Sequence, residues 1–475
     1  MDYEAVIGLE VHVQLRTRSK IFCSCSTKFG APPNNHTCPV CLGMPGVLPV
    51  VNRQVIEYAL KMALATNCRI PAWNRFARKH YFYPDLPKGY QISQYEFPLA
   101  EHGWITVGTN GQSRRIGITR IHLEDDAGKL VHDESRPLSY VDLNRTGTPL
   151  IEIVSEPDMH TPEEAAEYLR KIRQIVRYLE ISDGNMEQGS LRCDANISLR
   201  PRGQEKFGVK SELKNMNSFR NVQKALEYEI RRHAALLQDG QEIIQETRLW
   251  DTAREVTLPM RGKEKAHDYR YFPDPDLLPT AIDENWVNRI KSEMPELPAQ
   301  KCDRFREQYG LPPYDAGVLT DSRGLAEYFE KTAAIFPEPK TVSNWIMVEI
   351  IRLLKQDERE IESCPVSPEK LAELLKLVKD QVISSTTAKE VLQDAYSSGI
   401  SPGKIVKEKG LIQVSDESTL STVIEKVLKD HPAEVEKYRS GTRKVLGFLM
   451  GRVMKETQGR ANPKKVNAML LKALE

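Results

Sequence analysis

The feature that most constrains the fold is a change of hydrophobic periodicity along the 475-residue chain. Before about residue 290, segments such as 5–15 and 191–199 alternate between apolar and polar residues, which is typical of half-buried strands. Beyond two proline-rich stretches, 273–279 and 295–298, the pattern is helical to the end. A chain of this length needs more than one core. The sequence therefore predicts an α+β protein in which a sheet-containing domain precedes helical ones.

Two long helices are expected between the strands of the first part. Thr161 is a suitable N-cap, and Pro162 can occupy the first position of a helix with an apolar stripe that includes Leu169. A second helix is expected from Ser218 to Leu236. Because strands and helices do not alternate regularly, a mixed or antiparallel sheet is favoured over a doubly wound parallel one. We predict three domains, with boundaries 1–292 for the sheet domain, 293–400 for an all-α helical domain and 401–475 for a small α-helical tail.

The overall composition is that of a soluble globular protein, with 40% hydrophobic and 28% charged residues. The acidic start at residues 1–4 does not resemble a signal peptide, and no stretch approaches the roughly 18 apolar residues of a membrane span. We expect a cytoplasmic protein without a membrane partner. The net charge of +1 conceals a basic end, because residues 441–475 carry eight Lys and Arg against two acidic residues. Such a local excess suits contact with RNA.

Four of the eight cysteines form two close pairs near the N-terminus, at Cys23, Cys25, Cys38 and Cys41. Two pairs on separate turns allow four thiolates to converge tetrahedrally on zinc. A catalytic zinc with His36 as a ligand, or a nucleophilic cysteine, is the alternative. Four thiolates leave no coordination position for water, which favours a structural zinc. Eight cysteines are too few for a disulfide scaffold.

Carboxylates and one imidazole form a second candidate site. Glu10 and His12 project from the same strand face, about 7 Å apart by strand rise. The acidic run 124–126 and Glu152, which lies within an apolar segment, add further carboxylates that suit a hard cation bridging phosphates. In the structural alternative, Glu152 pairs with an arginine such as Arg145, and the acidic run is an exposed turn. Spacing alone does not unite these residues.

Segment 78–91 combines basic and aromatic residues that can contact phosphates and bases, or it is a loop packed on the core. The polar strand faces around 192–200 and 210–214 can line an RNA groove, although the solvated side of an antiparallel sheet explains them better. Neither a P-loop nor a G-x-G-x-x-G turn occurs. If ATP binds, it binds by another arrangement.

Several sequence blocks together resemble the B-subunit family of tRNA-dependent amidotransferases. The resemblance covers essentially the whole chain, and its most specific block is 142–152. The blocks are 6–12 (VIGLEVH), the cysteine pairs, 79–85 (KHYFYPD), 90–94 (YQISQ), 122–129 (HLEDDAGK), 141–152 (VDLNRTGTPLIE), 189–196 (GSLRCDAN), 269–274 (YRYFPD), 447–451 (GFLMG) and 461–463 (ANP).

The resemblance implies a cradle-shaped catalytic domain, a helical domain and a YqeY-like tail that contacts tRNA. It also implies a heterotrimeric, ATP-dependent ligase with glutamine as amido donor. In that complex the A subunit liberates ammonia, the C subunit holds the other two together, and the B subunit phosphorylates the side-chain carboxylate of Glu-tRNA(Gln) or Asp-tRNA(Asn). Ammonia then displaces phosphate to form the amide. The rival hypothesis is a non-catalytic subunit for tRNA binding or assembly.

The family's magnesium site corresponds to Glu10, His12, Glu152 and the second acid of block 122–129. That acid is Asp125 here, where glutamate is common, so Asp125 acts through a water or Glu124 substitutes for it. The resemblance therefore implies catalysis by Glu10, His12, Asp125 and Glu152, and Mg²⁺ held by Glu10, His12, Glu124, Asp125 and Glu152. It implies zinc on Cys23, Cys25, Cys38 and Cys41 as an accessory of the fold. For ATP we predict contacts with Lys79, His80, Tyr81 and Lys88.

Overall fold

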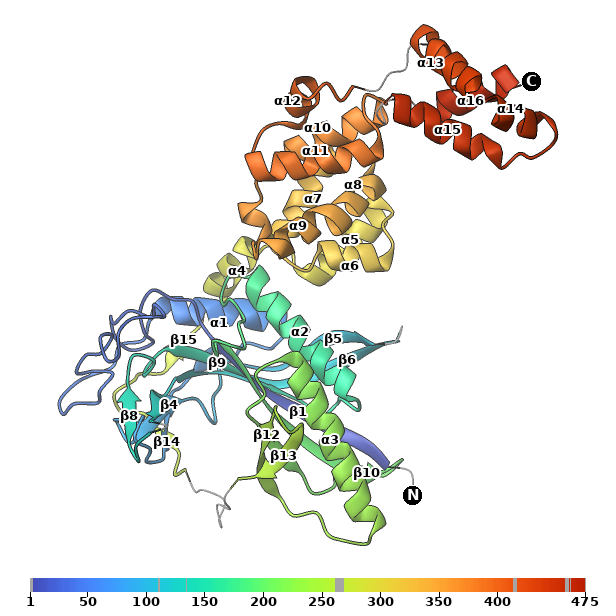
Figure 1. Ribbon diagram of the computed structural model, residues 1–475. Coiled ribbons are helices and arrows are strands. Elements are labelled where there is room, and N and C mark those ends of the chain that lie inside the picture. Colours follow the sequence, from blue (N-terminus) through green and yellow to red (C-terminus); the bar gives the residue numbers. More distant parts are fainter. Residues whose placement is uncertain are drawn as a thin grey trace. The chain divides into compact units, whose positions relative to one another are not determined.

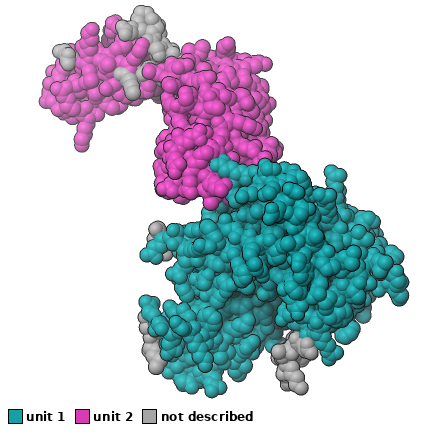
Figure 2. Space-filling view, turned by 180° about the vertical axis from the view of Figure 1, so that it is seen from behind, with its two compact units in different colours: residues 1–297 teal, residues 298–475 magenta. Residues whose placement is uncertain are grey.

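The computed structural model describes residues 3–109, 112–133, 135–260, 269–412, 417–457, 461 and 463–474. The chain divides into two compact units, residues 1–297 and 298–475. Figure 1 shows their elements and Figure 2 colours the two units separately. The first unit combines strands with helices, and the described part of the second is helical, so the α+β prediction is confirmed. In the described ranges, no helix is long and apolar enough to cross a membrane.

An eight-stranded sheet organises the first unit. Neighbouring strands run antiparallel except for one parallel pair, β11 with β12, so the sheet is mixed as predicted. In spatial order the strands are β13 (Val256–Pro259), β12 (Glu246–Asp251), β11 (Ser211–Lys214), β10 (Leu191–Pro201), β1 (Tyr3–Gln14), β9 (Pro149–Ser155), β6 (Gln112–Asp125) and β5 (Ala100–Thr109).

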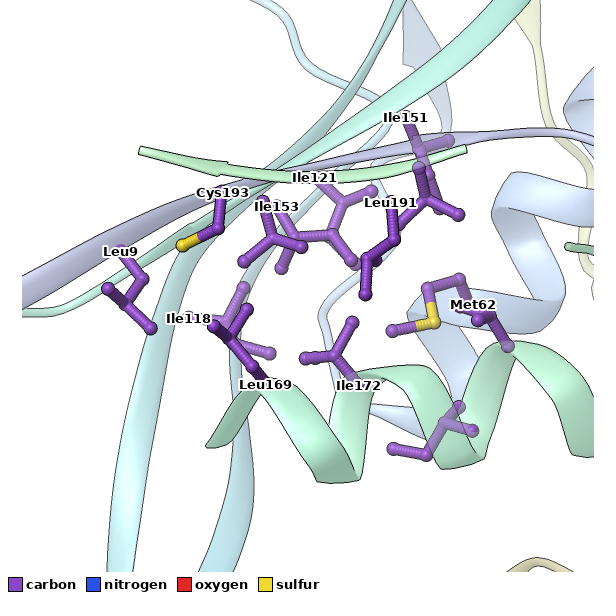
Figure 3. Packing of buried hydrophobic residues seen from close by; sticks show 14 of the residues in the cluster. Leu9, Met62, Ile118, Ile121, Ile151, Ile153, Leu169, Ile172, Leu191 and Cys193 are labelled. Carbon is purple, nitrogen blue, oxygen red and sulfur yellow. The ribbon is translucent and has the colours of Figure 1, made fainter. Parts of the chain in front are cut away.

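One face of this sheet is covered by three helices, α1 (Arg53–Ala65), α2 (Pro162–Tyr178) and α3 (Phe219–Gln238). Alternation along each strand sends its apolar residues to this face. In Figure 3, Leu9, Ile153 and Cys193 from three strands pack towards Leu169 and Met62 of the helices. Each fully buried aliphatic side chain of this kind contributes about 1.5–3 kcal/mol. We call the opposite side of the sheet the open face.

The two helices predicted from their N-caps are present. The Thr161 hydroxyl accepts a hydrogen bond from the Glu164 backbone N–H, and the Glu164 carboxylate accepts one from the Thr161 N–H, which makes a capping box at the start of α2. Ser218 caps α3 in the same way by accepting from the Asn221 N–H. These caps set where each helix begins and thus which of its residues face the sheet.

Short strands form smaller sheets beside the large one. A three-stranded sheet contains β3 (Ala77–His80), β4 (Tyr90–Ser93) and β14 (Phe272–Pro273), so segments about 190 residues apart in sequence lie together. Two two-stranded sheets complete the set: β2 (Trp73–Asn74) with the distant β15 (Thr280–Ala281), and β7 (Lys129–His132) with the next strand, β8 (Ser139–Asp142). The unit ends with α4 (Glu284–Glu293).

The second unit has two separate clusters of buried hydrophobic residues, one from 305 to 406 and one from 420 to 474. The predicted boundaries at 292/293 and 400/401 stay predictions. The described helices are α5 (Pro298–Tyr309), α6 (Pro313–Leu319), α7 (Arg323–Ile335), α8 (Pro339–Trp345), α9 (Ile351–Gln356), α10 (Pro368–Lys379), α11 (Ser385–Ser398), α12 (Pro402–Glu408), α13 (Glu417–Asp430), α14 (Pro432–Arg439), α15 (Val445–Glu456) and α16 (Pro463–Leu474).

Candidate metal centres

The four N-terminal cysteines converge in one cluster. Their Sγ atoms all lie within 4.8 Å of one another, and no disulfide joins them. The Sγ atoms of Cys38 and Cys41 are 3.9 Å apart. Four sulfurs at about 2.3 Å from a tetrahedral zinc ion would be separated by about 3.8 Å. The arrangement therefore fits a closed zinc site with four thiolates, and His36 is not part of this ligand group.

A buried lysine lies against the cysteine cluster. Lys20 is completely buried, donates to the carbonyl oxygens of His36 (2.6 Å) and Leu143 (3.4 Å), and has its Nζ 3.6 Å from Cys41 Sγ. A hydrogen bond from Cys23, reinforced by the charge of Lys20, lowers the pKa of Cys41 to about 4 against the effect of burial. The lysine thus compensates thiolate charge, and it ties the cluster to the loop that precedes β9.

A second cluster is built by the register of the central strands. His122 of β6 is the cross-strand partner of Glu152 in β9, Glu152 is also the partner of His12 in β1, and His12 is the partner of Arg192 in β10. Because side chains alternate, all four belong to the open face, and Glu124 joins them two residues after His122. Figure 1 shows the strands β10, β1, β9 and β6 side by side.

The distances in this cluster suit a cation. His12 Nε2 lies 3.3 Å from a Glu152 oxygen and 3.6 Å from a Glu124 oxygen, and the three candidate ligand atoms lie within 4.8 Å of one another. His122 Nε2 lies 3.2 Å from Glu152 and 3.8 Å from Glu124. Neighbouring ligands of an octahedral Mg²⁺ are about 3 Å apart. Two carboxylates and an imidazole therefore fit a divalent cation after small adjustments.

The electrostatics show carboxylates that the protein does not fully neutralise. Burial, together with the charge of Glu152, raises the pKa of Glu124. Burial acts in the same direction on Glu152, but His122 and His12 hold its pKa well below the usual range. Burial would lower the pKa of His12, yet the two glutamates raise it to about 9. A bound cation would replace these protons as the counter-charge.

Glu10 belongs to an adjacent cluster with Asp194 and Glu212, whose ligand atoms also lie within 4.8 Å of one another. Lys214 lies 2.7 Å from Asp194 and 3.0 Å from Glu212, and Asn196 donates to Glu10 at 3.0 Å. Burial raises the pKa of Glu10, and Glu152 and Asp194 add to the shift. Glu10 therefore interacts electrostatically with the first cluster while its closest acidic partners come from β10 and β11.

Asp125 has different partners from its neighbour Glu124. It projects from the other side of β6, is 1% exposed, accepts a hydrogen bond from the Ile92 N–H at 2.7 Å and forms an ion pair with Lys88. Burial raises the pKa of Asp125 although the charge of Lys88 opposes this. Of the residues predicted for magnesium, the structure brings together His12, Glu124 and Glu152. Glu10 interacts with them only electrostatically, because the charge of Glu152 raises its pKa. The Asp125 side chain points towards β4.

The fold contains neither structural alternative for the acidic residues, which were an exposed turn at 124–126 and an ion pair between Glu152 and Arg145. The run 124–126 is buried at the end of β6 and not in an exposed turn. Arg145 lies 3.5 Å from Asp126, which also binds Arg192 (3.0 Å) and Gln14 (2.8 Å). Glu152 is paired with histidines instead. Glu124 and Asp126 thus belong to the polar network of the open face, whereas Asp125 does not.

The basic and aromatic segment lies beside this cluster. Lys79 Nζ is 4.8 Å from the ring centre of Tyr269, and His80 stacks on Phe272 with ring centres 4.8 Å apart. Burial raises the pKa of Tyr81, and the charges of Glu124 and Asp125 add to it. The segment is packed on the core only in part: Leu86 is buried and Tyr90 packs against the core, whereas Phe82 is 89% exposed. The assignment of Lys79, His80, Tyr81 and Lys88 to ATP stays a prediction.

Sequence reasoning did not assign His122, Arg192, Asp194 or Glu212 to the cation site, although it considered the strand faces around 192–200 and 210–214 as a possible RNA groove. Each lies on the polar side of an alternating strand, and that alternation was visible in residues 191–199. The missing information was strand order, because the pairings of β1 with β9 and β10, of β9 with β6 and of β10 with β11 bring these side chains to His12 and Glu10. His122 had a local signal, since it lies two residues before Glu124 on a strand.

These features define an α+β protein with a closed thiolate site and an open carboxylate–imidazole site in its first unit. Residues 5–288 match the family described as the GatB/GatE catalytic domain, and residues 327–474 match the GatB domain. The chain is 57% identical over 475 residues, all of both chains, to the B subunit of the aspartyl/glutamyl-tRNA(Asn/Gln) amidotransferase of Thermodesulfovibrio yellowstonii. It is 57% identical over 472 residues to the B subunit of the same enzyme from Carboxydothermus hydrogenoformans, covering 99% of this chain and 98% of the relative.

The chain belongs to this family of amidotransferase B subunits, and the resemblance of the sequence blocks is confirmed. Its members are subunits of a ligase-type enzyme complex, and this chain contains the catalytic domain. Membership also implies partner subunits, since the relatives are named as one subunit of an assembly.

Proposed function

We propose that the first unit uses Mg-ATP to phosphorylate the side-chain carboxylate of a misacylated Glu-tRNA(Gln) or Asp-tRNA(Asn). A substrate carboxylate oxygen attacks the γ-phosphorus, ADP leaves, and ammonia then attacks the acyl carbon with release of phosphate. The names of the relatives support the substrate class. The single observation that carries the proposal is the cluster of His12, Glu124 and Glu152 on the open face.

Phosphoryl transfer depends mostly on positioning and on neutralising charge. Mg²⁺, when bound, would supply that neutralisation and orient the phosphate oxygens. We assign His12, Glu124 and Glu152 as its ligands, with Glu10 beside them. His122 holds Glu152 in place at 3.2 Å and is therefore a positioning residue. This assignment prefers Glu124 to Asp125, because Asp125 is committed to Lys88 and to the Ile92 amide.

Lys79 and the aromatic residues around it are suited to the nucleotide. Lys79 approaches tyrosine rings, and in the described part of the chain no carboxylate forms an ion pair with it, so its charge is available to phosphate. Lys88 would have to leave Asp125 before it could contact a phosphate. We therefore rank Lys79 above Lys88 as a phosphate ligand.

The partners follow from the same proposal. A glutaminase-type A subunit supplies ammonia, and a C subunit holds it to this chain. The basic C-terminal segment, with eight Lys and Arg in residues 441–475, contacts the tRNA. The zinc bound by the cysteine cluster has a structural role, since four thiolates leave no position for a reactant. The complex operates in the cytoplasm, where its tRNA substrates are.

The decisive experiment replaces Glu152 by glutamine in the assembled complex. Glutamine keeps the shape but loses the charge, so tRNA-dependent ATP hydrolysis should fall by at least about 100-fold. Glutaminase activity and tRNA affinity should persist. Glu163→Gln, on α2 across the sheet, is the matched control and should retain full activity. Unchanged ATP hydrolysis in Glu152→Gln would favour the rival hypothesis of a non-catalytic tRNA-binding or assembly subunit.

A further inference from the structure

An arginine of the open face lies in the same row of the sheet as the candidate cation ligands. Arg192 of β10 is the cross-strand partner of His12 in β1, and His12 is the partner of Glu152 in β9. Cross-strand partners in antiparallel pairs have their Cα atoms about 4.5–5.5 Å apart. The three side chains therefore project from the same side of three adjacent strands, which Figure 1 shows next to one another.

The Arg192 side chain is held by a buried carboxylate. Its Nη2 donates to Asp126 at 3.0 Å, and Asp126 is 3% exposed. Asp126 has further partners, since the Gln14 amide donates to it at 2.8 Å and Arg145 lies 3.5 Å away. Asp126 would therefore keep two side-chain partners if the guanidinium of Arg192 were removed. The ion pair fixes the position of Arg192, but the carboxylate does not depend on it.

Most of the hydrogen-bonding capacity of this guanidinium is unused. A guanidinium presents several N–H donors in a planar fork. Among the described residues, Arg192 makes its one hydrogen bond with Asp126, and its buried Nε has no partner. The side chain is 36% exposed, so a ligand on the open face can reach its terminal nitrogens. Because buried donors are normally paired, the free N–H groups point to an acceptor from outside the chain.

Two other cations of the open face show the contrast. Lys214 lies within 3.0 Å of two carboxylates, Asp194 and Glu212. Arg200, on the same side of β10 as Arg192, donates through Nε to Glu4 at 2.6 Å and through Nη1 to a backbone carbonyl. Both cations are neutralised by acids of the sheet, so their roles are structural.

The charge of Arg192 acts on the cation cluster. Burial would lower the pKa of Arg192, but Asp126 holds it above its usual value, and Glu124 adds to this rise. The guanidinium therefore stays protonated and interacts with a proposed Mg²⁺ ligand. Mg²⁺ neutralises only part of the charge of a triphosphate, and a planar fork of donors matches phosphate oxygens. A guanidinium that stabilises a phosphoryl group during transfer accelerates such reactions by about 10³–10⁵.

We propose that Arg192 is a catalytic residue that stabilises the γ-phosphoryl group of ATP during its transfer to the substrate carboxylate. In this step the bond between the carboxylate oxygen and the γ-phosphorus forms, the bond from phosphorus to the β–γ bridging oxygen breaks, and ADP leaves with that electron pair. Arg192 donates its free N–H groups to the phosphoryl oxygens and keeps its protons. The inference rests on the proposed function for the reaction, to which it adds a cation that belongs to the chain.

The first test replaces Arg192 by glutamine in the assembled complex. Arg192→Gln retains a donor for Asp126 but loses the charge, so tRNA-dependent ATP hydrolysis at saturating substrates should fall at least about 100-fold. The KM values for ATP and for aminoacyl-tRNA should change by less than about threefold, because the lost interaction is made mainly in the transition state. Glutaminase activity should not change.

The second test measures binding and needs no turnover. Mg-ADP with aluminium fluoride imitates the phosphoryl group during transfer, and calorimetry with the assembled complex measures its affinity. The wild type should bind this mimic at least about 100-fold more tightly than Mg-ADP alone. In Arg192→Gln the preference should fall below about tenfold, with the affinity for Mg-ADP unchanged.

Arg200→Gln is the matched control, since it removes an arginine from the same side of the same strand. It should change neither the rate nor the preference for the mimic. Arg192→Gln should melt at the wild-type temperature, because Asp126 keeps Gln14 and Arg145. If it melts early, Arg192→Lys decides: lysine can retain the ion pair with Asp126, but a single ammonium lacks the fork, so the rate should fall at least about tenfold.

Three results would overturn the inference. The first is a wild-type rate of ATP hydrolysis in Arg192→Gln. The second is an equal loss of affinity for Mg-ADP and for the mimic, which would make Arg192 a ground-state ligand. The third is a raised KM for aminoacyl-tRNA at an unchanged rate, which would assign Arg192 to RNA. The proposed function fails separately, if Glu152→Gln retains ATP hydrolysis; the inference fails alone if Glu152→Gln loses it and Arg192→Gln does not.

Discussion

The two candidate metal centres of the first unit were assembled in opposite ways. The four cysteines lie within residues 23–41, and their spacing alone predicts a convergent site. His12, Glu124 and Glu152 are far apart in the sequence, and only the pairing of β1, β9 and β6 brings them together. A local motif can be recognised without a fold, whereas a site on a sheet depends on strand order and register.

The centres also differ in how the protein compensates their charge. Lys20 is buried against Cys41 and offsets one thiolate before any metal binds. In the acidic cluster, burial and the charge of Glu152 raise the pKa of Glu124. The charges of His12 and His122 act in the opposite direction but do not offset this rise. Glu229 in α3 is a third case, in which Arg232 (2.8 Å) and Arg248 (3.1 Å) neutralise a buried carboxylate completely. A carboxylate whose charge the protein does not fully compensate, such as Glu124, is thus distinguished from a structural one, such as Glu229, by its need for an external cation.

Loss of a cysteine ligand should have the largest effect. Cys41→Ser is expected to abolish high-affinity zinc binding, because structural zinc in small domains contributes on the order of 10 kcal/mol. Metal analysis of the purified chain should give about one zinc per wild-type chain and less than about a tenth in the variant. Cys302→Ser, outside the cluster, is the control and should retain zinc. Retained zinc in Cys41→Ser would contradict the four-thiolate site.

Neighbouring acids of β6 should separate function from stability. Asp125→Asn leaves Lys88 as an uncompensated buried charge and should destabilise the fold by about 3–5 kcal/mol in chemical denaturation. Glu124→Gln removes a proposed cation ligand and should lower ATP hydrolysis by at least about 100-fold with little change of stability. The opposite pattern would return Asp125 to the cation site.

Glu229 predicts an acid-dependent loss of stability. Burial acts to raise its pKa, but His233 and Arg232 lower it to about 2. Because the folded pKa lies below the unfolded one, Glu229 stabilises the fold by about 3 kcal/mol above about pH 5, and this contribution disappears as the pH falls towards about 2. Glu229→Gln should therefore be less stable than wild type by about 3 kcal/mol at about pH 7 and by about 1–2 kcal/mol at about pH 3.

Urea denaturation at the two pH values measures this difference, with the exposed Glu167→Gln as control. A difference that does not change with pH would show that Glu229 is not held ionised by its arginines.

The smallest effect is expected at Lys20. Lys20→Met keeps much of the volume but removes the cation near Cys41, so zinc affinity should fall by about 10–100-fold while the four ligands remain. Competition with a chromogenic chelator measures the affinity, and Lys28→Met, at an exposed position between the two cysteine pairs, should retain it. Equal affinities in both variants would limit Lys20 to its hydrogen bonds with His36 and Leu143.

Much of the first unit was predictable because its signals are local. Alternation predicted the strands that became β1 and β10, and the caps at Thr161 and Ser218 predicted the starts of α2 and α3. The cysteine spacing predicted the cluster that forms. Each of these signals lies within one strand, one helical turn or one short loop, where backbone geometry follows directly from residue type.

What the sequence determined by itself is the set of elements, the cysteine cluster and, through its blocks, the family. Tertiary structure decided which acid joins His12 and Glu152, because adjacent residues of a strand face opposite sides and register selects Glu124 over Asp125. It also decided that Glu10 lies with Asp194 and Glu212. These outcomes depend on contacts between segments far apart in sequence, which no local pattern encodes.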